Sequence, residues 1–123
     1  AASEEFSARK DEVLHIVRHI DEMKVSEIID LLKHLAEDKA AINDYLDLLL
    51  LWYRDVLMFK ATRSALRITY KEEILTLQRQ AAGKSFEALD HIIEAFAELR
   101  ARLKANVNFD AAVELLLLAL KEK

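Results

Sequence analysis

The chain contains no proline and a single glycine, Gly83, among its 123 residues. Proline and glycine supply many of the turns and strand ends on which β-sheets depend, so a sheet-based fold is disfavoured. The rest of the composition, 53% apolar and 33% charged, is typical of amphipathic helices that pack together. A chain of this length can bury a substantial core within one domain. We therefore expect residues 1–123 to form a single all-α domain, a bundle of roughly six helices.

One segment, Tyr45–Phe59, is apolar on nearly every side of a helix. Such a helix belongs in the interior of a packed domain. Arg54 and Asp55 stand side by side in its middle, and a charge placed there needs a partner or a route to solvent. The segment is therefore predicted to be the central helix, with the Arg-Asp pair in a boundary ion pair or a helix-cap contact at the edge of the core.

Apolar residues recurring at three- and four-residue steps predict where the other helices lie. The predicted helices cover about 3–23, 26–36, 40–62, 69–82, 85–104 and 108–120. In the second helix, Val25, Ile28, Ile29, Leu32 and Leu35 are expected on one face. The predicted N-caps are Ser3, Thr69 (with Glu72 completing a capping box) and Asn108, and the fifth helix is expected to open at Ser85. Gly83 is expected to provide a left-handed C-cap, and residues 62–69 form the longest predicted loop.

The histidines invite comparison with metal-binding bundles. Glu12 and His15 form one Glu-x-x-His step, with His19 one turn further on. Carboxylate-bridged di-metal bundles use that step twice, together with two further glutamates. Here the step occurs once, so these histidines are expected at surface or boundary positions, and no metal ligand is predicted.

Catalytic motifs are also missing from the sequence. With one glycine the chain cannot carry a phosphate-binding loop, a dinucleotide fingerprint or a nucleophile elbow, and with no cysteine it has no thiolate chemistry. Acidic pairs such as Glu72-Glu73 lie at predicted helix starts, where capping explains them. We expect no catalytic residue, no cofactor and no small-molecule ligand, so the chain is predicted not to be an enzyme.

Charge and hydropathy argue against two further classes of partner, nucleic acids and membranes. A net charge of −4 and a pI near 5.6 argue against a nucleic-acid-binding domain. No uninterrupted apolar run is longer than Leu48–Tyr53, which is too short to cross a membrane. A basic run is made up of Lys60, Arg63, Arg67 and Lys71. It fits either a contact with phosphates or a solvated loop, and we expect at most a weak or indirect contact with DNA.

The third and last predicted helices carry more apolar positions than one packing stripe requires. Two explanations stay open: deep burial, or a face reserved for a partner protein. The candidates for a partner face are Phe109, Leu115, Leu116, Leu117 and Leu118.

Taken in order, these features resemble the C-terminal domain of bacterial DNA polymerase III delta-prime subunits, which belong to the clamp-loader family. Members show a leucine-rich helix ending in an Arg-Asp-Leu-Leu-like step, which stands here as Arg54-Asp55-Val56-Leu57. A later helix ends in Arg-x-x-Leu-x-x-Asn-Val-Asn, which stands here as residues 100–108 with Asn106 and Asn108 in the asparagine positions. Family members often have proline next, whereas this chain has Phe109. The change removes a favoured first-turn residue but keeps the asparagine cap.

This resemblance implies an assembly role. In the family a two-part AAA+ module precedes the helical domain, and five such domains form a ring-shaped collar that holds the subunits while the clamp is loaded. The resemblance therefore implies an oligomerisation domain acting in DNA replication in the cytoplasm, with other clamp-loader subunits as partners. The AAA+ module expected upstream is not part of this chain, so no ATP binding is expected. The alternative is a free-standing helical adaptor or regulator that binds a partner helix or peptide in a groove.

Overall fold

The computed structural model describes residues 2–123, which form six α-helices and three short 3-10 turns, with no strand among them. The α-helices are α1 (Ala2–His19), α2 (Val25–Ala36), α3 (Ile42–Thr62), α4 (Ile74–Gly83), α5 (Phe86–Lys104) and α6 (Phe109–Ala119). The 3-10 turns are η1 (Ile20–Glu22), η2 (Lys39–Ala41) and η3 (Lys71–Glu73). The predicted all-α class with six helices is confirmed, and the largest boundary error lies at the start of α4.

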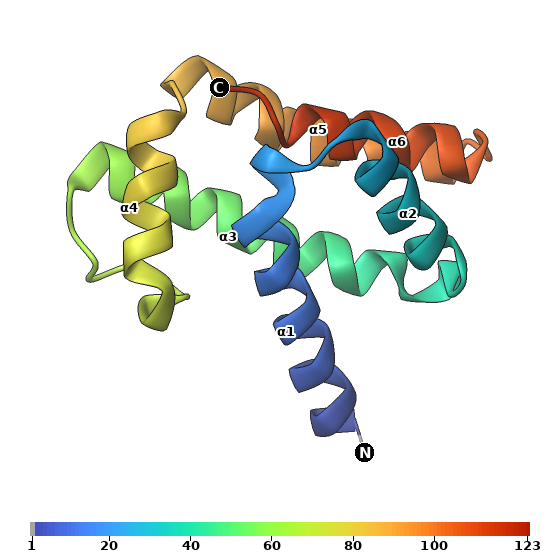
Figure 1. The fold of residues 1–123 in the computed structure, drawn as a ribbon, viewed down its shortest axis with the longest axis horizontal. Helices are drawn as coiled ribbons and strands as arrows, with labels where there is room; N and C mark the ends of the chain where they lie inside the picture. Colours follow the sequence, from blue (N-terminus) through green and yellow to red (C-terminus); the bar gives the residue numbers. More distant parts are fainter. Residues whose placement is uncertain (1) are drawn as a thin grey trace.

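Helix α3 crosses the middle of the bundle, and α1, α4 and α5 pack against it (Figure 1). Helix α6 lies along one edge, where it packs against α5 and α2. The N-terminal half of α1 extends beyond the bundle, and residues 3–8 of that half are exposed (Figure 1). The bundle therefore leaves helical surface uncovered at the outer side of α6 and beside the projecting part of α1.

The core is built around the aromatic side chains of α3. Trp52 and Tyr53 are completely buried. The ring of Trp52 packs against Tyr70 with centroids 5.5 Å apart, and the ring of Tyr53 packs against Phe96 at 6.2 Å. A stripe of α3 remains only partly buried, and it consists of Leu50, Leu51, Leu57 and Met58. The central position predicted for this helix is confirmed, but its burial is not complete.

The Arg-Asp pair in α3 is divided between two environments. Arg54 is exposed, whereas Asp55 is only 4% exposed. The Asp55 carboxylate accepts hydrogen bonds from the backbone N–H groups of Thr69, at 3.0 and 3.1 Å, and of Tyr70, at 2.8 Å. Asp55 thus makes the cap-type contact that was one of the two predicted roles for the pair, and Arg54 takes no part in it.

This contact explains why the capping box predicted at Thr69 and Glu72 is wrong. Asp55 already satisfies the N–H groups at the start of this segment, so the chain enters η3 first, and α4 begins only at Ile74. The Glu72 carboxylate instead accepts hydrogen bonds from its own backbone and from Lys10. The first contact, and next the second, lower the pKa of this carboxyl. The start of α4 is therefore fixed by a distant side chain on α3.

The N-cap predicted at Asn108 is confirmed, and Ser85, where the fifth helix is expected to open, is the N-cap of α5. The Ser85 hydroxyl accepts a hydrogen bond from the Ala88 N–H at 3.0 Å, and the Asn108 side chain accepts one from the Ala111 N–H at 2.9 Å. Ser3 instead lies inside α1, which already includes Ala2, so the cap predicted there is wrong.

The left-handed C-cap predicted at Gly83 is also wrong. Gly83 is the last residue of α4 and has no positive φ, because the chain passes directly into the extended residue Lys84, at φ −120°. Among residues 2–123 the positive φ angles belong to Arg63, at 55°, and Asn106, at 59°. The left-handed turns therefore follow α3 and α5 rather than α4.

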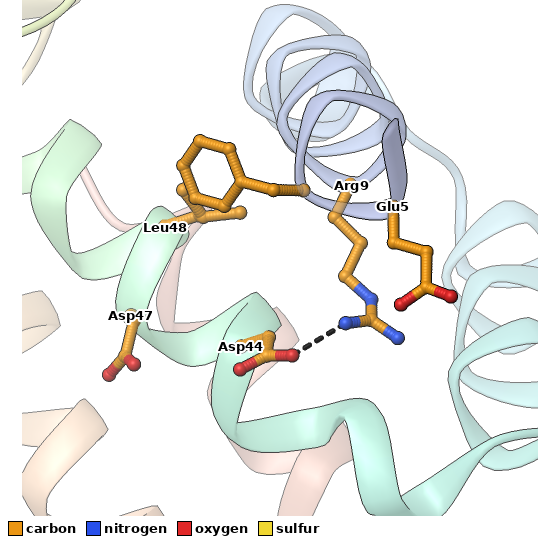
Figure 2. A pocket seen from close by; sticks show the side chains of 6 residues that line it. Glu5, Arg9, Asp44, Asp47 and Leu48 are labelled. Carbon is orange, nitrogen blue, oxygen red and sulfur yellow. Dashed lines mark hydrogen bonds and ion pairs between the residues drawn. The ribbon is translucent and has the colours of Figure 1, made fainter. Parts of the chain in front are cut away.

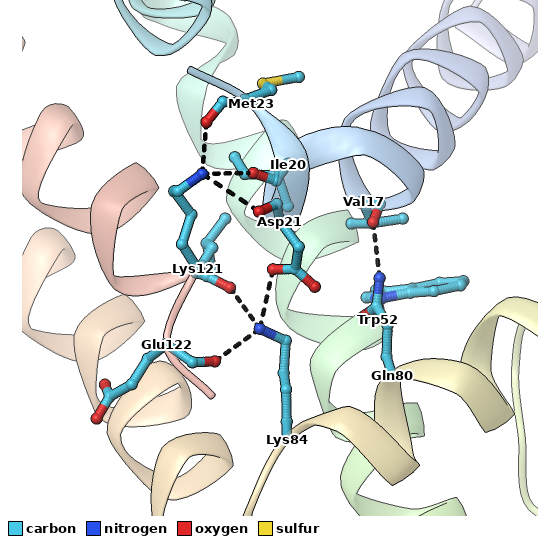
Figure 3. A network of polar contacts seen from close by, with 10 residues as sticks. Val17, Ile20, Asp21, Met23, Trp52, Gln80, Lys84, Lys121 and Glu122 are labelled. Carbon is cyan, nitrogen blue, oxygen red and sulfur yellow. Dashed lines mark hydrogen bonds and ion pairs between the residues drawn. The ribbon is translucent and has the colours of Figure 1, made fainter. Parts of the chain in front are cut away.

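A buried ammonium group ties the C-terminal residues to the rest of the bundle (Figure 3). The side chain of Lys84 is almost fully buried, and its Nζ donates to Asp21 Oδ1 at 3.0 Å. The same Nζ donates to the backbone carbonyls of Leu120, at 2.9 Å, and Glu122, at 2.7 Å. These three partners offset the cost of burying the Lys84 charge, and they hold the end of α6 beside η1.

Two further side chains reinforce this region. Lys121 Nζ donates to the backbone carbonyl of Met23 at 2.5 Å, which anchors the link between η1 and α2. The buried amide of Gln80 accepts from Trp52 Nε1 at 2.9 Å and donates to the α1 backbone at Val17, at 2.7 Å (Figure 3). Helix α6 and helix α2 are thus held in fixed positions relative to the core.

Candidate protein-protein interface

The acidic and histidine side chains do not assemble into a metal centre within residues 2–123, where no group of three or more potential ligands occurs. His15 and His19 pack against each other, with ring centroids 4.6 Å apart. The Glu12 carboxylate instead accepts a hydrogen bond from the Tyr45 hydroxyl at 2.5 Å and lies 3.4 Å from His34 Nε2. Burial, and next the contact with Glu12, raise the pKa of Tyr45 to about 12.

The polypeptide between α5 and α6 forms a compact turn that sets the direction of α6. The N–H of Asn106 donates to the Leu103 carbonyl at 3.2 Å, and the N–H of Val107 donates to the Arg102 carbonyl at 3.0 Å. This pair of bonds is the Schellman motif, whose left-handed residue is usually glycine or asparagine. Asn108 then caps α6. Of the two asparagines in the Asn-Val-Asn motif, Asn106 therefore ends α5 and Asn108 starts α6. These two residues have structural roles.

Helix α6 carries most of the residues predicted as a partner face, and the structure divides them. Leu116 and Leu117 are 2% and 0% exposed, so they belong to the core of the domain and not to a free surface. Leu115 and Leu118 are 52% and 46% exposed. Phe109 is partly buried, with the Lys39 ammonium 5.2 Å from its ring centroid. Of the predicted residues, Leu115 and Leu118 form the outward apolar part.

Helix α2, which packs against α6, contributes two more exposed apolar side chains. Val25 is 69% exposed and Ile29 is also exposed, although their spacing predicted that both would share the buried face with Ile28. The structure buries Ile28, and Leu32 and Leu35 with it, which leaves the other edge of the apolar stripe free. We call the exposed residues of these two helices the α2–α6 face: Val25, Ile29, Leu115 and Leu118. The exposed positions of α2 could not be predicted from the sequence, because the apolar stripe of α2 is wider than the part of it that packs against the rest of the domain.

Acidic residues accompany this face on α6. Asp110 is exposed in the first turn, and Glu114 lies one turn before Leu118. An apolar centre with charges at its edge is the usual composition of a protein-protein interface. The arrangement can bury apolar area against a partner while the carboxylates select that partner's charge.

A hollow of about 550 Å³ opens beside Phe109, between η2, α3 and the end of α5. Its lining includes Ile42 and the cationic side chains of Lys39 and Lys104. Arg100 also lines it and donates to Asp47 Oδ1 at 2.7 Å. The hollow is open and carries basic groups at its edge, so it suits a side chain of a partner better than an enclosed small molecule.

A second open hollow separates the projecting part of α1 from α3 (Figure 2). Leu48 and Phe6 provide its apolar lining, and Phe6 is 58% exposed. Arg9 spans the hollow to Asp44 Oδ2 at 2.5 Å, as Figure 2 shows. Phe6 is thus a large exposed apolar side chain held beside α3 by an ion pair.

The basic run around the α3–α4 loop is dispersed in the structure. Lys60 Nζ donates to the Ala81 carbonyl at 2.9 Å and lies 5.0 Å from the ring centroid of Phe86. Arg63 adopts the left-handed conformation that ends α3, and Arg67 is exposed in the loop. The first two residues of the run therefore have local structural roles, so fewer of its basic side chains are available for phosphate contacts.

The comparisons with known proteins give one family. A family model described as DNA polymerase III, delta subunit, C terminal, matches residues 4–122. No curated protein and no solved structure matches the chain significantly. Across residues 2–123, no helix combines the length and the apolar character that a membrane crossing requires.

Proposed function

The chain belongs to the family of C-terminal domains of the DNA polymerase III delta subunit, a clamp-loader family, and from this premise we propose that it is an assembly domain. Its task is to hold clamp-loader subunits together in a collar while the sliding clamp is loaded for DNA replication. The partners are other clamp-loader subunits, which it binds through helix surfaces, in the cytoplasm. An AAA+ module would precede this domain in the full-length protein.

The observation that carries the proposal is the division of the leucine run in α6. Leu116 and Leu117 complete the domain's own core, whereas Leu115 and Leu118 point outward, and α2, which packs against α6, also exposes Val25 and Ile29. Exposed apolar side chains on adjoining helices gain stability when a partner removes them from water. The α2–α6 face is therefore the proposed contact with one neighbour.

The mechanism needs no chemistry from this domain. Apolar burial supplies the affinity, and the carboxylates of Asp110 and Glu114 at the edge of the face disfavour acidic partners and favour basic ones. We propose that the domain neither binds ATP nor catalyses a reaction, and that any contact with DNA is weak or indirect. Its contribution to clamp loading is to fix the order and spacing of the subunits.

Within the family we propose the delta-prime paralogue. The support is the order of motifs: Arg54-Asp55 in the leucine-rich helix, followed by Asn106 and Asn108 around the α5–α6 turn. The structure gives three of these four residues defined structural roles, in the cap-type contact of Asp55 and the turn of the two asparagines. A Ser-Arg-Cys motif in an upstream AAA+ module would support this assignment, and its absence there would contradict it.

A double variant tests the α2–α6 face. Leu115→Asp with Leu118→Asp should weaken binding to at least one purified clamp-loader subunit by more than about tenfold, because two carboxylates would be buried without partners. Leu75→Asp is the matched control, since Leu75 is 79% exposed on α4, outside this face. Equal binding by the double variant, the control and the unaltered chain would contradict the proposal.

A further inference from the structure

Arg54 occupies the centre of an apolar surface on α3. The residues three and four positions before and after it are its neighbours on the helix surface. These neighbours are Leu50, Leu51, Leu57 and Met58, and all four are partly buried. The guanidinium is therefore flanked on the helix surface by apolar side chains, and the acidic residue next to it in the sequence, Asp55, is buried. We call these five residues the Arg54 stripe.

Arg54 also lacks a partner from other helices. Among residues 2–123, no hydrogen bond or ion pair joins its side chain to an acidic group, and the adjacent Asp55 is committed to Thr69 and Tyr70. Four other arginines of the helices form pairs, Arg9 with Asp44, Arg18 with Glu73, Arg100 with Asp47 and Arg102 with Glu98, whereas Arg79 on α4, like Arg54, has none among the described residues. The positive charge at the centre of the stripe is therefore available to a partner.

Two ion pairs join α3 to neighbouring helices before the stripe begins. Helix α1 reaches α3 through the Arg9–Asp44 pair and α5 reaches it through the Arg100–Asp47 pair, and both aspartates precede Leu50, the first residue of the stripe. The hollow beside Phe6 includes Asp47 and Leu48, which precede the stripe on α3 (Figure 2).

We propose that the Arg54 stripe is a second subunit interface, which receives a helix of a neighbouring clamp-loader subunit carrying a carboxylate between apolar residues. This inference rests on the proposed assembly function. A guanidinium buried in an interface requires an anionic partner, and a carboxylate can meet it with two parallel hydrogen bonds. Apolar neighbours around such an arginine exclude water and strengthen the contact.

Head-to-tail assembly explains why one domain would have two such faces. In a ring, each subunit contacts its two neighbours through different surfaces. Helix α6 of this chain shows the kind of helix that the stripe would receive, because Glu114 accompanies the exposed Leu115 and Leu118. The α2–α6 face is acidic at its edge and the Arg54 stripe is cationic at its centre, so the two faces have opposite charge.

The pattern does not suit a nucleic acid. Phosphate recognition uses several cations placed side by side, whereas here four apolar side chains surround one guanidinium. A protein helix matches both the apolar neighbours and the single charge.

Charge reversal tests the inference. Arg54→Glu and Arg54→Ala should each bind one clamp-loader subunit more weakly than the unaltered chain, with a loss of at least about tenfold for Arg54→Glu. Arg67→Glu is the matched control, because Arg67 is exposed in the α3–α4 loop and should bind normally. Thermal unfolding should be unchanged in all three variants, since both arginines are exposed. Normal binding of both Arg54 variants to every subunit would overturn the inference.

A crosslinking experiment gives an independent readout. Met58→p-benzoylphenylalanine in the assembled clamp loader should photo-crosslink to the subunit whose binding Arg54→Glu weakens. The absence of a crosslink, or a crosslink from this position to primed DNA instead, would overturn the inference.

The two proposals can fail separately. If the unaltered chain binds subunits and only the Leu115, Leu118 double variant is impaired, the assembly function stands and the second interface does not. If the unaltered chain binds no subunit, both proposals fail.

Discussion

The carboxylate of Asp55 accepts a hydrogen bond from the backbone N–H of Tyr70 at 2.8 Å, although the two residues lie on different segments of the fold. Tyr70 returns the contact to α3, because its hydroxyl donates to the Leu48 carbonyl at 3.0 Å and its ring packs on Trp52. Burial, and next the charge of Asp55, raise the pKa of Tyr70 to about 12. Tyr70, which precedes η3 and α4, is thus bound to the central helix both through its backbone N–H and through its side chain.

Removal of the Asp55 carboxylate should destabilise the domain. Asp55→Ala leaves the N–H groups of Thr69 and Tyr70 without their acceptor, and we expect a loss of about 2–4 kcal/mol in the free energy of unfolding. Asp55→Asn keeps one acceptor oxygen and should lose less. Urea denaturation measures both values. Asp47→Ala on the same helix is the control, because an exposed ion pair contributes at most about 1 kcal/mol. Equal losses at the two aspartates would contradict the capping role.

The Tyr53 hydroxyl is buried and has no hydrogen-bond partner among the described residues. Burial also raises the pKa of Tyr53. Tyr53→Phe removes the unsatisfied group and keeps the ring, so the free energy of unfolding should stay constant or rise by about 1 kcal/mol. The matched variant Tyr70→Phe loses the bond to Leu48 and should be about 1 kcal/mol less stable. A loss at Tyr53 as large as that at Tyr70 would show that the hydroxyl contributes to stability.

Sequence patterns predicted the helices well because apolar spacing marks their extent and short-range caps mark the starts of α5 and α6. Ser85 and Asn108 cap helices through residues three positions away, which is a contact that local sequence encodes. The start of α4 could not be predicted in this way, because the N–H groups of Thr69 and Tyr70, just before η3, are satisfied by Asp55, fifteen residues away from Tyr70. The Arg-Asp pair was recognised as unusual, yet only the packing of the loop on α3 shows which member is buried.

Replacement of the single glycine should stabilise the domain. Gly83 ends α4 without a positive φ, and a Cβ atom at this position would meet no atom within 4 Å. Gly83→Ala reduces the freedom of the unfolded chain and should raise the free energy of unfolding by about 0.5–1 kcal/mol. Calorimetry of the two proteins measures the difference. A lower unfolding temperature for the variant would indicate that Gly83 needs a conformation that alanine avoids.

His91 should titrate above its ordinary range. The Glu122 carboxylate, 2.9 Å from Nδ1, hydrogen-bonds the ring and attracts its positive charge, and both effects raise the pKa of His91. Because the folded pKa is the higher one, the stabilisation is fully present below about pH 6.5 and is lost as the pH rises through the folded pKa. NMR titration should show that Glu122→Gln lowers the pKa of His91, while Glu114→Gln leaves it unchanged. The same pKa in both variants would contradict the contact.

The candidate interface was predictable only in part. Excess apolar character in the last helix directed attention to its leucine run, but periodicity could not separate the exposed Leu115 and Leu118 from the buried Leu116 and Leu117. That separation depends on α6 packing against both α5 and α2, which is a property of the tertiary structure. The same packing leaves Val25 and Ile29 exposed at the edge of α2.

The central claim is that this domain assembles clamp-loader subunits, and its most direct test is the mass of the complex that it forms. The purified chain is mixed with the other clamp-loader subunits of the same organism, and size-exclusion chromatography with light scattering measures the mass in the presence and absence of each subunit. The account predicts a stable complex that contains this chain together with at least one other subunit. Elution of the chain at the mass of its free form in every mixture would contradict it.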